Sequence, residues 1–328
     1  MLKKTIQVLE YARIFSLPMT ILSWLVIFTY SIINFGNILY GIIAFIGICF
    51  VHLATNLVDD FFDYKYLIKM VNFDKEEYLK NSQKTKCRYL ISKKMTEGQI
   101  INVIILYLSI ALFIGGFLFF KCGIGVLYYM LAGGAIALLY PFFSRICMSE
   151  IMVALAYGPI LYGGMYYVMI GTTSADVFLL AIPSTIMTVV LLYIHTVMDY
   201  EYDLNEGKKT LANRFNSELD SLVVLKFLLI FAYLSVVLLC IMDIVDWQVF
   251  LTFLTIPLAV DLYKSLAVYS INHEEEPKRK WYHFPMENLA KLKERGESSF
   301  MFRMYQSRNL MIYFSIFFVI GIILSLAI

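Results

Sequence analysis

The segment from His52 to Lys65, HLATNLVDDFFDYK, follows an apolar run over residues 38–51. Its polar positions recur at i, i+3, i+4 and i+7, the spacing that places side chains on one side of a helix. These positions are Asn56, Asp59, Asp60 and Asp63. Carboxylates gathered in this way repel one another and favour a bound cation, and ligands that offer only oxygen suit Mg²⁺ better than zinc or copper. A solvated acidic patch just outside a membrane span is the alternative.

A second acidic segment lies in the other half of the chain. The apolar run over 178–197 ends in HTVMDYEYDLNEGKKTLANR, residues 195–214, where Asp199 and Asp203 stand about one helical turn apart. In both segments a histidine precedes the first motif residue by four positions. Two acidic helix ends can face each other across one cavity, and carboxylates bridged by Mg²⁺ would bind a diphosphate there.

The composition is that of an integral membrane protein. Of 328 residues, 60% are hydrophobic and only 16% are charged. Apolar runs of about twenty residues recur, which is the length that a helix needs to cross a bilayer core. The five cysteines show no paired spacing, so they predict neither disulfides nor a metal site. The basic N-terminus leads into a long span without a small-residue cleavage site, which favours a retained first helix over a signal peptide.

The hydropathy pattern predicts an all-α polytopic protein with about nine transmembrane helices around a central cavity. The expected spans are 14–35, 38–58, 100–120, 123–142, 150–170, 176–197, 220–242, 247–266 and 308–328. We expect a single domain over 1–328 that contains two four-helix modules, 14–142 and 150–266, and a ninth helix.

The basic residues indicate which side of the membrane each connection faces. With nine spans, only Lys121 falls on one side, and the other lysines and arginines of the N-terminus and loops fall on the other. Those residues are Lys3, Lys4, Arg13, Lys65, Lys69, Lys75, Lys80, Lys84, Lys86, Arg88, Lys93, Lys94, Arg145, Lys208, Lys209, Arg214, Lys226 and Lys264, with those of 278–308. The positive-inside rule then predicts a cell-membrane protein with a cytoplasmic N-terminus, both acidic motifs at the cytoplasmic side, and an outside C-terminus.

The loop after the first acidic motif offers candidate phosphate ligands. Arg88, Lys86, Lys93 and Lys94 can donate to phosphate oxygens, and Arg88 is the preferred candidate. For most of these lysines, the favoured explanation is charge that faces anionic lipid. Aromatic residues in the spans, Tyr140 among them, can line a cavity that shelters a carbocation, since an aromatic face stabilises a cation by roughly 0.5–2 kcal/mol.

Taken together, these segments resemble the UbiA-type intramembrane prenyltransferase superfamily, and within it the 1,4-dihydroxy-2-naphthoate polyprenyltransferases of menaquinone synthesis. RIFSLPMT at 13–20 resembles the family's opening segment, and TNLVDDFFDYK its first motif, Asn-Leu-x-Asn-Asp-Tyr-x-Asp. DYEYDLNEGKKTLANRF at 199–215 resembles its second motif, Asp-x-x-x-Asp followed by Gly-Lys-x-Thr-Leu. The resemblance also includes Arg88 with LISKKMT, LLYPFF at 138–143, Glu150, and YGPILYGGMYYVMIG at 157–171.

The resemblance implies a nine-helix fold in which Mg²⁺, held by both acidic motifs, binds a polyprenyl diphosphate. Loss of diphosphate gives an allylic cation, which a small aromatic acceptor attacks. The implied catalytic residues are Asp60, Asp63, Asp199 and Asp203. The implied metal ligands are these four with Asn56 and Asp59. The implied substrate-binding residues are Asn56, Arg88, Lys208, His195 and Tyr140. His195 would bind the acceptor or accept its proton, or else hold Asp199 as a polar helix residue.

The chain departs from the family pattern near the expected acceptor pocket. Asp59 replaces the second asparagine of the first motif, His52 stands where an amide is usual, and the acid expected shortly after Asp63 is missing. Other acceptors therefore stay open: a 4-hydroxybenzoate-like ring, a haem, a chlorin or a glycerol phosphate lipid. A secondary transporter and an inactive homologue are the alternatives from other classes. Carboxylates at helix ends rather than at the membrane midplane favour an enzyme over a transporter.

Overall fold

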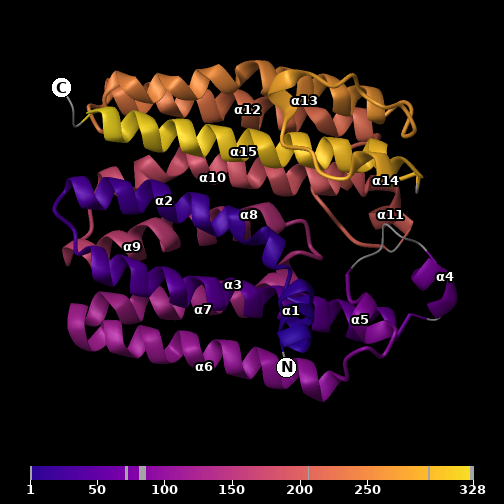
Figure 1. Ribbon diagram of the computed structural model, residues 1–328, viewed down its shortest axis with the longest axis horizontal. Helices are drawn as coiled ribbons and strands as arrows, with labels where there is room; N and C mark the ends of the chain where they lie inside the picture. Colours follow the sequence, from indigo (N-terminus) through magenta and orange to yellow (C-terminus); the bar gives the residue numbers. More distant parts are fainter. Residues whose placement is uncertain (1, 71–72, 81–85, 206, 295, 326–328) are drawn as a thin grey trace.

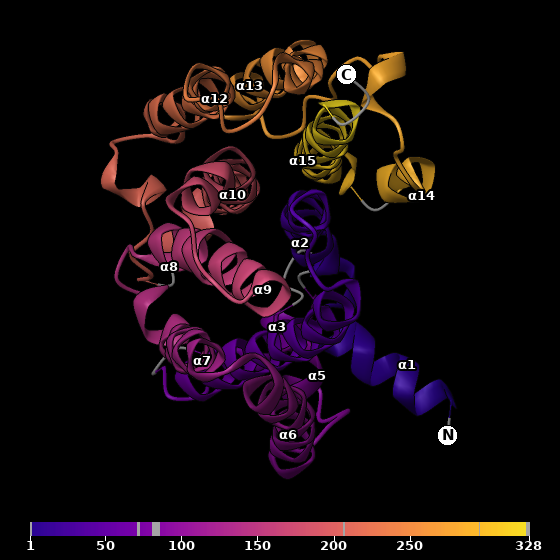
Figure 2. The same cartoon turned by 90° about the vertical axis from the view of Figure 1, so that its left-hand side faces the viewer.

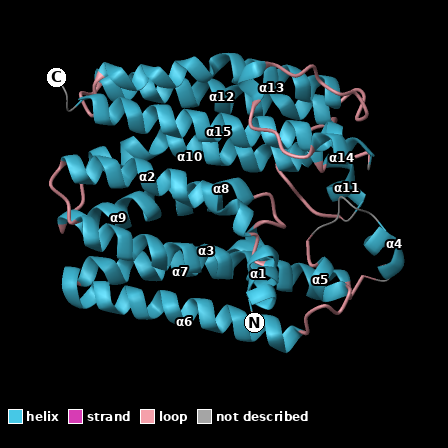
Figure 3. Cartoon of the chain, viewed as in Figure 1, coloured by secondary structure: helices cyan, strands magenta, loops and turns pink. Residues whose placement is uncertain are grey.

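The computed structural model describes residues 2–70, 73–80, 86–205, 207–294 and 296–325. Lys84 of the basic loop lies outside these residues. The described part is helical and contains no strand, and its single isolated bridge joins Ile146 to Lys209 (Figure 3). The expectation of an all-α protein is confirmed.

Nine helical segments in the described part of the chain are long and apolar enough to cross a membrane, which confirms the predicted number. They are Ile14–Ile33 (η1 Ile14–Ser16 and α2 Leu17–Ile33), α3 (Ile38–Leu67), α6 (Glu97–Cys122), α7 (Ile124–Phe143), Ser149–Ile170 (α8 Ser149–Leu155, η2 Ala156–Ile160 and α9 Leu161–Ile170), α10 (Ala175–Met198), α12 (Glu218–Ile241), Trp247–Tyr269 (η4 Trp247–Thr255 and α13 Ile256–Tyr269) and α15 (Ser298–Leu324).

Two spans extend further than hydropathy predicted, because buried polar residues continue them. Helix α3 ends at Leu67 rather than at residue 58, so the whole first acidic motif is helical. Helix α15 begins at Ser298 rather than at residue 308. Its first turns carry Arg303, which is fully buried and donates to the backbone carbonyl oxygens of Ser265 and Ser299, both at 2.8 Å. A hydropathy scan scores such residues as a loop although their polar groups are satisfied inside the protein.

The spans lie side by side along one direction, with α10 at the centre of the packing (Figure 1). Of the nine, α10 has the largest buried share and α6 the smallest, so α6 has the most surface available to lipid. Seen end-on in Figure 2, α10 and α2 separate α12, α13 and α15 from α3, α6 and α7. Helix α3 packs against α6, α10 against α12, and α2 against α9.

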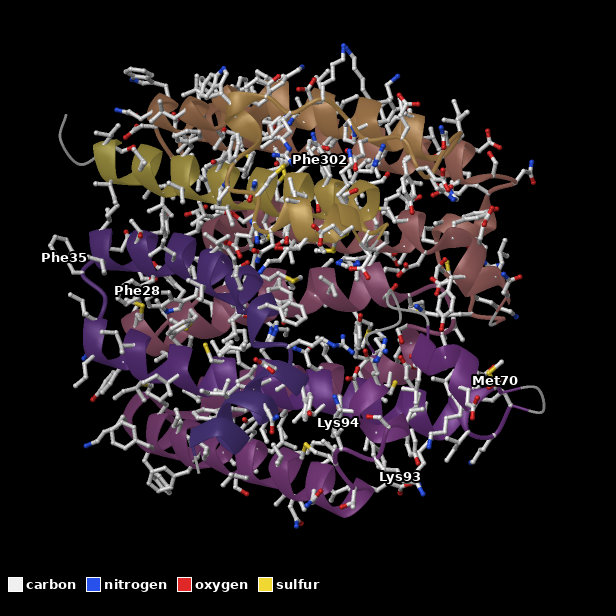
Figure 4. The ribbon with its side chains drawn as sticks, turned by 45° about the vertical axis from the view of Figure 1, so that its right-hand side comes forward. Phe28, Phe35, Met70, Lys93, Lys94 and Phe302 are labelled. Atoms are coloured by element: carbon white, nitrogen blue, oxygen red, sulfur yellow. The ribbon has the colours of Figure 1, made fainter. Side chains whose placement is uncertain are left out.

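The charged connections gather at one end of the bundle. The short helices α4 (Lys75–Lys80), α5 (Arg88–Ile91), α11 (Tyr200–Asn205) and α14 (Leu289–Glu294) all lie at the right-hand end of Figure 1. In Figure 4, Met70 lies toward this end and Phe35, which is 98% exposed, lies at the opposite end, where a short turn joins α2 to α3. This segregation agrees with the one-sided distribution of lysine and arginine.

The contact between α15 and η4 allows no side chain at Gly321. A Cβ there would lie 2.6 Å from the Cα of Val249 and 2.8 Å from the carbonyl oxygen of Gln248, both backbone atoms. Gly321→Ala is therefore expected to destabilise the protein by about 1–3 kcal/mol through overpacking. Gly116→Ala in α6 is the matched control, because nothing lies within 4 Å of its Cβ position. Thermal denaturation in detergent should show a lower midpoint for the Gly321 variant alone, and equal midpoints would contradict this packing.

Candidate active site

A cavity of about 1360 Å³ opens among the spans, and both acidic motifs line it. Most of its remaining lining is apolar and comes from α3, α6, α7 and the α8–α9 span. Its charged lining includes Arg13, Asp59, Asp63, Lys86, Arg145, Asp199, Asp203 and Lys208. The predicted central cavity is present, and the two motifs share it.

The first motif presents two carboxylates that are already paired with cations. The Lys86 ammonium group donates to Asp59 at 2.8 Å and to Asp63 at 3.2 Å. Arg145 donates to the other oxygen of Asp63 at 2.5 Å and stacks its guanidinium 3.8 Å from the centre of the Tyr66 ring. The buried Oδ1 of Asp59 accepts no hydrogen bond. Asp59 and Asp63 thus form a pair of neighbouring carboxylates in which Oδ1 of Asp59 has no hydrogen-bond partner.

Asp60 and Arg88 do not line the cavity. Asp60 is 2% exposed, pairs with Arg13 and accepts a hydrogen bond from the Cys87 backbone N–H at 3.4 Å. Successive helical residues are rotated by about 100° around the helix axis. Asp60 therefore faces the loop that contains Cys87, while Asp59 faces the cavity. The motif is one stripe in sequence but divides between two environments. Arg88 donates to the backbone carbonyl oxygen of Leu79 instead of facing the acidic residues.

Lys86, and not Arg88, is the basic residue of this loop that contacts the carboxylates of the first motif. Burial alone would lower its pKa, but the charges of Asp59 and Asp63 outweigh burial and raise the pKa above the usual value of a lysine. Its ammonium group is therefore firmly protonated beside the two carboxylates. Arg145 was also missed as a site residue. The available signal was that Arg145 is the single basic residue in the short connection between α7 and α8.

The second motif faces the first across the cavity. Asp199 caps the C-terminus of α10 and Asp203 lies in α11, with the Asp203 N–H donating to the Asp199 carbonyl at 2.8 Å. Lys208 lies 3.3 Å from Asp203. Burial raises the pKa of Asp203. The positive charges of Lys208 and Lys86 act in the opposite direction and lower it, while the negative charge of Asp63 raises it. The two motifs are therefore close enough to act on each other electrostatically.

The other predicted binding residues also line the cavity. Asn56 donates through its side-chain amide to the Ala12 carbonyl oxygen at 3.0 Å and to Ser16 Oγ at 3.1 Å. Tyr140 lies near the end of α7, and His195 lies on the last turn of α10. The His195 imidazole makes no hydrogen bond to another described residue, so it does not hold Asp199 by that means.

The residues present fit a magnesium ion that arrives with its substrate. Within the described residues, no three side chains of His, Cys, Asp or Glu are gathered closely enough to hold a metal ion alone. Mg²⁺ commonly takes one or two carboxylates and completes its shell with water and substrate phosphates. The carboxylates of Asp59 and Asp63 on α3, Asp199 at the C-terminus of α10 and Asp203 on α11 would supply oxygen ligands, and the Oδ1 atom of Asp59 accepts no hydrogen bond.

The model of the UbiA prenyltransferase family matches residues 15–289, and the chain belongs to that family. It is therefore a membrane prenyltransferase, and the alternative hypothesis of a secondary transporter is wrong. No curated protein matches it in sequence.

Solved structures show the same fold. Digeranylgeranylglyceryl phosphate synthase is 17% identical, with a TM-score of 0.57 over 98% of this chain and 99% of that one. A UbiA homologue from Archaeoglobus fulgidus, bound to GPP and Mg²⁺, is 14% identical, with a TM-score of 0.58 over 92% of this chain and 99% of that one. A UbiA homologue from Aeropyrum pernix K1 is 12% identical, with a TM-score of 0.57 over 92% and 97%.

Proposed function

We propose that this protein transfers a polyprenyl group from its diphosphate to a small aromatic acceptor, with 1,4-dihydroxy-2-naphthoate as the first choice, in the synthesis of a menaquinone-type quinone. The observation that carries the proposal is a single cavity with a charged end and an apolar remainder. The charged end combines carboxylates of both motifs with Lys86, Arg145 and Lys208. This division matches a substrate that has a diphosphate head and a hydrocarbon tail.

The donor would bind through both motifs. Asp59, Asp63, Asp199 and Asp203 would hold Mg²⁺, which when bound neutralises charge that develops on the leaving diphosphate. Lys86, Arg145 and Lys208 would then donate to phosphate oxygens. Asn56 and Asp60 support this arrangement by tying α3 to the segment around residues 12–16.

The apolar part of the cavity would shelter the prenyl chain and the allylic cation. Side chains such as Ile48, Leu112 and Met130 line it. A lining of this kind excludes water, which would otherwise capture the cation. Tyr140 lies in the same cavity, where its ring can stabilise positive charge by roughly 0.5–2 kcal/mol. His195 lies close to the second motif and remains a candidate contact for the acceptor.

The charged end of the bundle would face the cytoplasm. The connections that carry most lysine and arginine residues lie at that end, and short turns lie at the other (Figure 1), as the positive-inside rule expects. The membrane would be the plasma membrane. A soluble aromatic acceptor would then enter from the cytoplasm while the prenyl tail stays in the bilayer. We also propose that residues 14–142 and 150–266 act as two modules that each supply one acidic motif.

The naphthoate assignment rests on the resemblance of the sequence segments, so the direct test is a choice of acceptors. Purified protein in nanodiscs would receive Mg²⁺, a radiolabelled long-chain prenyl diphosphate, and either 1,4-dihydroxy-2-naphthoate or 4-hydroxybenzoate. We expect a lipid-soluble product from the naphthoate, and none after Mg²⁺ is removed with EDTA. Product from the benzoate alone would overturn the naphthoate assignment and retain the donor site. Product formation that continues in EDTA would contradict the metal-dependent mechanism.

A further inference from the structure

A second polar cluster lines the cavity one helical turn from Asn56 along α3, centred on His52. The Nε2 atom of His52 lies 2.6 Å from Ser16 Oγ. Its Nδ1 atom lies 2.7 Å from the Tyr157 hydroxyl and 2.9 Å from Thr20 Oγ1. The cluster therefore joins the first, second and fifth spans, and the hydrogen bond from Asn56 to Ser16 Oγ links it to the first acidic motif.

The hydrogen bonds determine which ring nitrogen of His52 carries the proton. Ser16 Oγ donates its single hydrogen to the Arg13 carbonyl oxygen at 2.7 Å, so it must accept from its other neighbours. Asn56 is one donor to it, and the Nε2–H of His52 is the other. Because Nε2 holds the proton, Nδ1 of the neutral ring is an acceptor that faces the hydroxyl of Tyr157.

Tyr157 is presented by an irregular turn. It lies in η2, a π-helical turn, next to Gly158, whose φ of −94° and ψ of −105° are not helical. A Cβ at Gly158 would lie 3.1 Å from Thr185 Oγ1. Such π-turns occur often at functional sites. Here the turn directs a tyrosine hydroxyl into the cavity, where it donates to Nδ1 and keeps its own oxygen lone pairs for a further hydrogen bond.

We propose that Tyr157 and His52 form a proton relay that accepts the hydroxyl proton of the prenyl acceptor, so that the acceptor is a hydroxyaromatic compound. This inference rests on the proposed function and names its general base. An acceptor placed here would lie about 10 Å along α3 from Asp59, since Asp59 follows His52 by seven positions and each position contributes about 1.5 Å. That separation leaves room for the diphosphate and the reacting carbon between the two groups.

The bond between the first prenyl carbon and the bridging oxygen of the diphosphate breaks, and its electron pair leaves with the diphosphate. A ring carbon of the acceptor bonds to the prenyl carbon. The ring hydroxyl gives its proton to the Tyr157 oxygen, and the Tyr157 proton moves to Nδ1 of His52. The ring carbon then loses a proton to the released diphosphate, or loses carbon dioxide if it carried a carboxylate. The acceptor oxygen recovers a proton from the imidazolium of His52 through Tyr157.

Two substitutions test the relay with little change in shape. His52→Gln keeps an amide N–H for Ser16 but offers no basic nitrogen, and Tyr157→Phe removes only the hydroxyl. Tyr166→Phe is the matched control, since Tyr166 lies on the same span outside the cavity lining and makes no side-chain hydrogen bond to a described residue. Each relay variant is expected to lower kcat on 1,4-dihydroxy-2-naphthoate by about a hundredfold. The double variant should be no worse, because the two residues act as one unit.

The measurement that discriminates is the rate on an acceptor whose hydroxyl group is more acidic and so loses its proton more easily. A fluorinated dihydroxynaphthoate with a more acidic hydroxyl should recover much of the lost rate, while Mg²⁺-dependent donor binding stays at the wild-type level in every variant. Rates within about threefold of wild type in both relay variants would overturn the inference. An equal loss on both acceptors would also overturn it, because a merely structural role predicts that result. Wild-type protein that binds donor but prenylates no hydroxyaromatic compound would instead overturn the proposed function.

Discussion

Asp63→Asn is expected to reduce prenyl transfer by about a thousandfold, a loss of roughly 4 kcal/mol of transition-state stabilisation. Asp63 lies where the Lys86 and Arg145 cations converge, and it faces Asp203 across the cavity. Removing its charge weakens the oxygen ligand set for Mg²⁺ and leaves two basic groups without their shared partner. The measurement is steady-state turnover in nanodiscs at saturating donor, acceptor and Mg²⁺.

Asp220→Asn provides the control for Asp63→Asn. Asp220 is an aspartate in the first turn of α12, and it is exposed and does not line the cavity. Its substitution should leave turnover unchanged. A variant of Asp63 that retained wild-type turnover would remove the first motif from the mechanism.

Lys86→Met is expected to weaken binding of the prenyl diphosphate by about thirtyfold, or roughly 2 kcal/mol, which is typical for a lost hydrogen bond to a charged group. Lys86 already lies against Asp59 and Asp63, and a phosphate group bound beside these residues would come within its reach. Methionine keeps much of the aliphatic length and removes the ammonium group. The measurement is the dissociation constant of a labelled prenyl diphosphate in the presence of Mg²⁺.

Arg88→Met is the comparison for Lys86→Met, two residues further along the same loop. Because Arg88 donates to a backbone carbonyl group outside the cavity lining, its substitution should change the dissociation constant by less than about threefold. The reverse order of effects would show that Arg88, as the sequence suggested, is the phosphate ligand.

The sequence predicted the spans and the shared cavity because both depend on local patterns. Runs of apolar residues report membrane helices, and lysine and arginine report their sidedness. Helical spacing also placed Asp59 and Asp63 together. It could not separate Asp60 from them. Neighbouring helical residues point about 100° apart, but the sequence does not say which of these directions faces the cavity. Arg88 and Lys86 differ for a similar reason, since the path of a loop decides which of two basic residues faces the carboxylates.

The His52 cluster could not be predicted from spacing. Its members Ser16, Thr20, His52 and Tyr157 come from three spans, and each is an ordinary polar residue in its own segment. Only the packing of α2 and η2 beside α3 brings them together. The π-turn at Tyr157 is equally invisible in the sequence, where Gly158 and Pro159 indicate an irregularity but not its direction.

The central claim is that carboxylates of both motifs hold one Mg²⁺–diphosphate site. Equilibrium binding of a non-hydrolysable prenyl thiolodiphosphate to protein in nanodiscs tests it most directly, with Asp63→Asn and Asp203→Asn beside the wild type. We predict saturable binding that requires Mg²⁺ and is lost in either variant. Binding that persists in EDTA, or in both variants, would contradict the shared site.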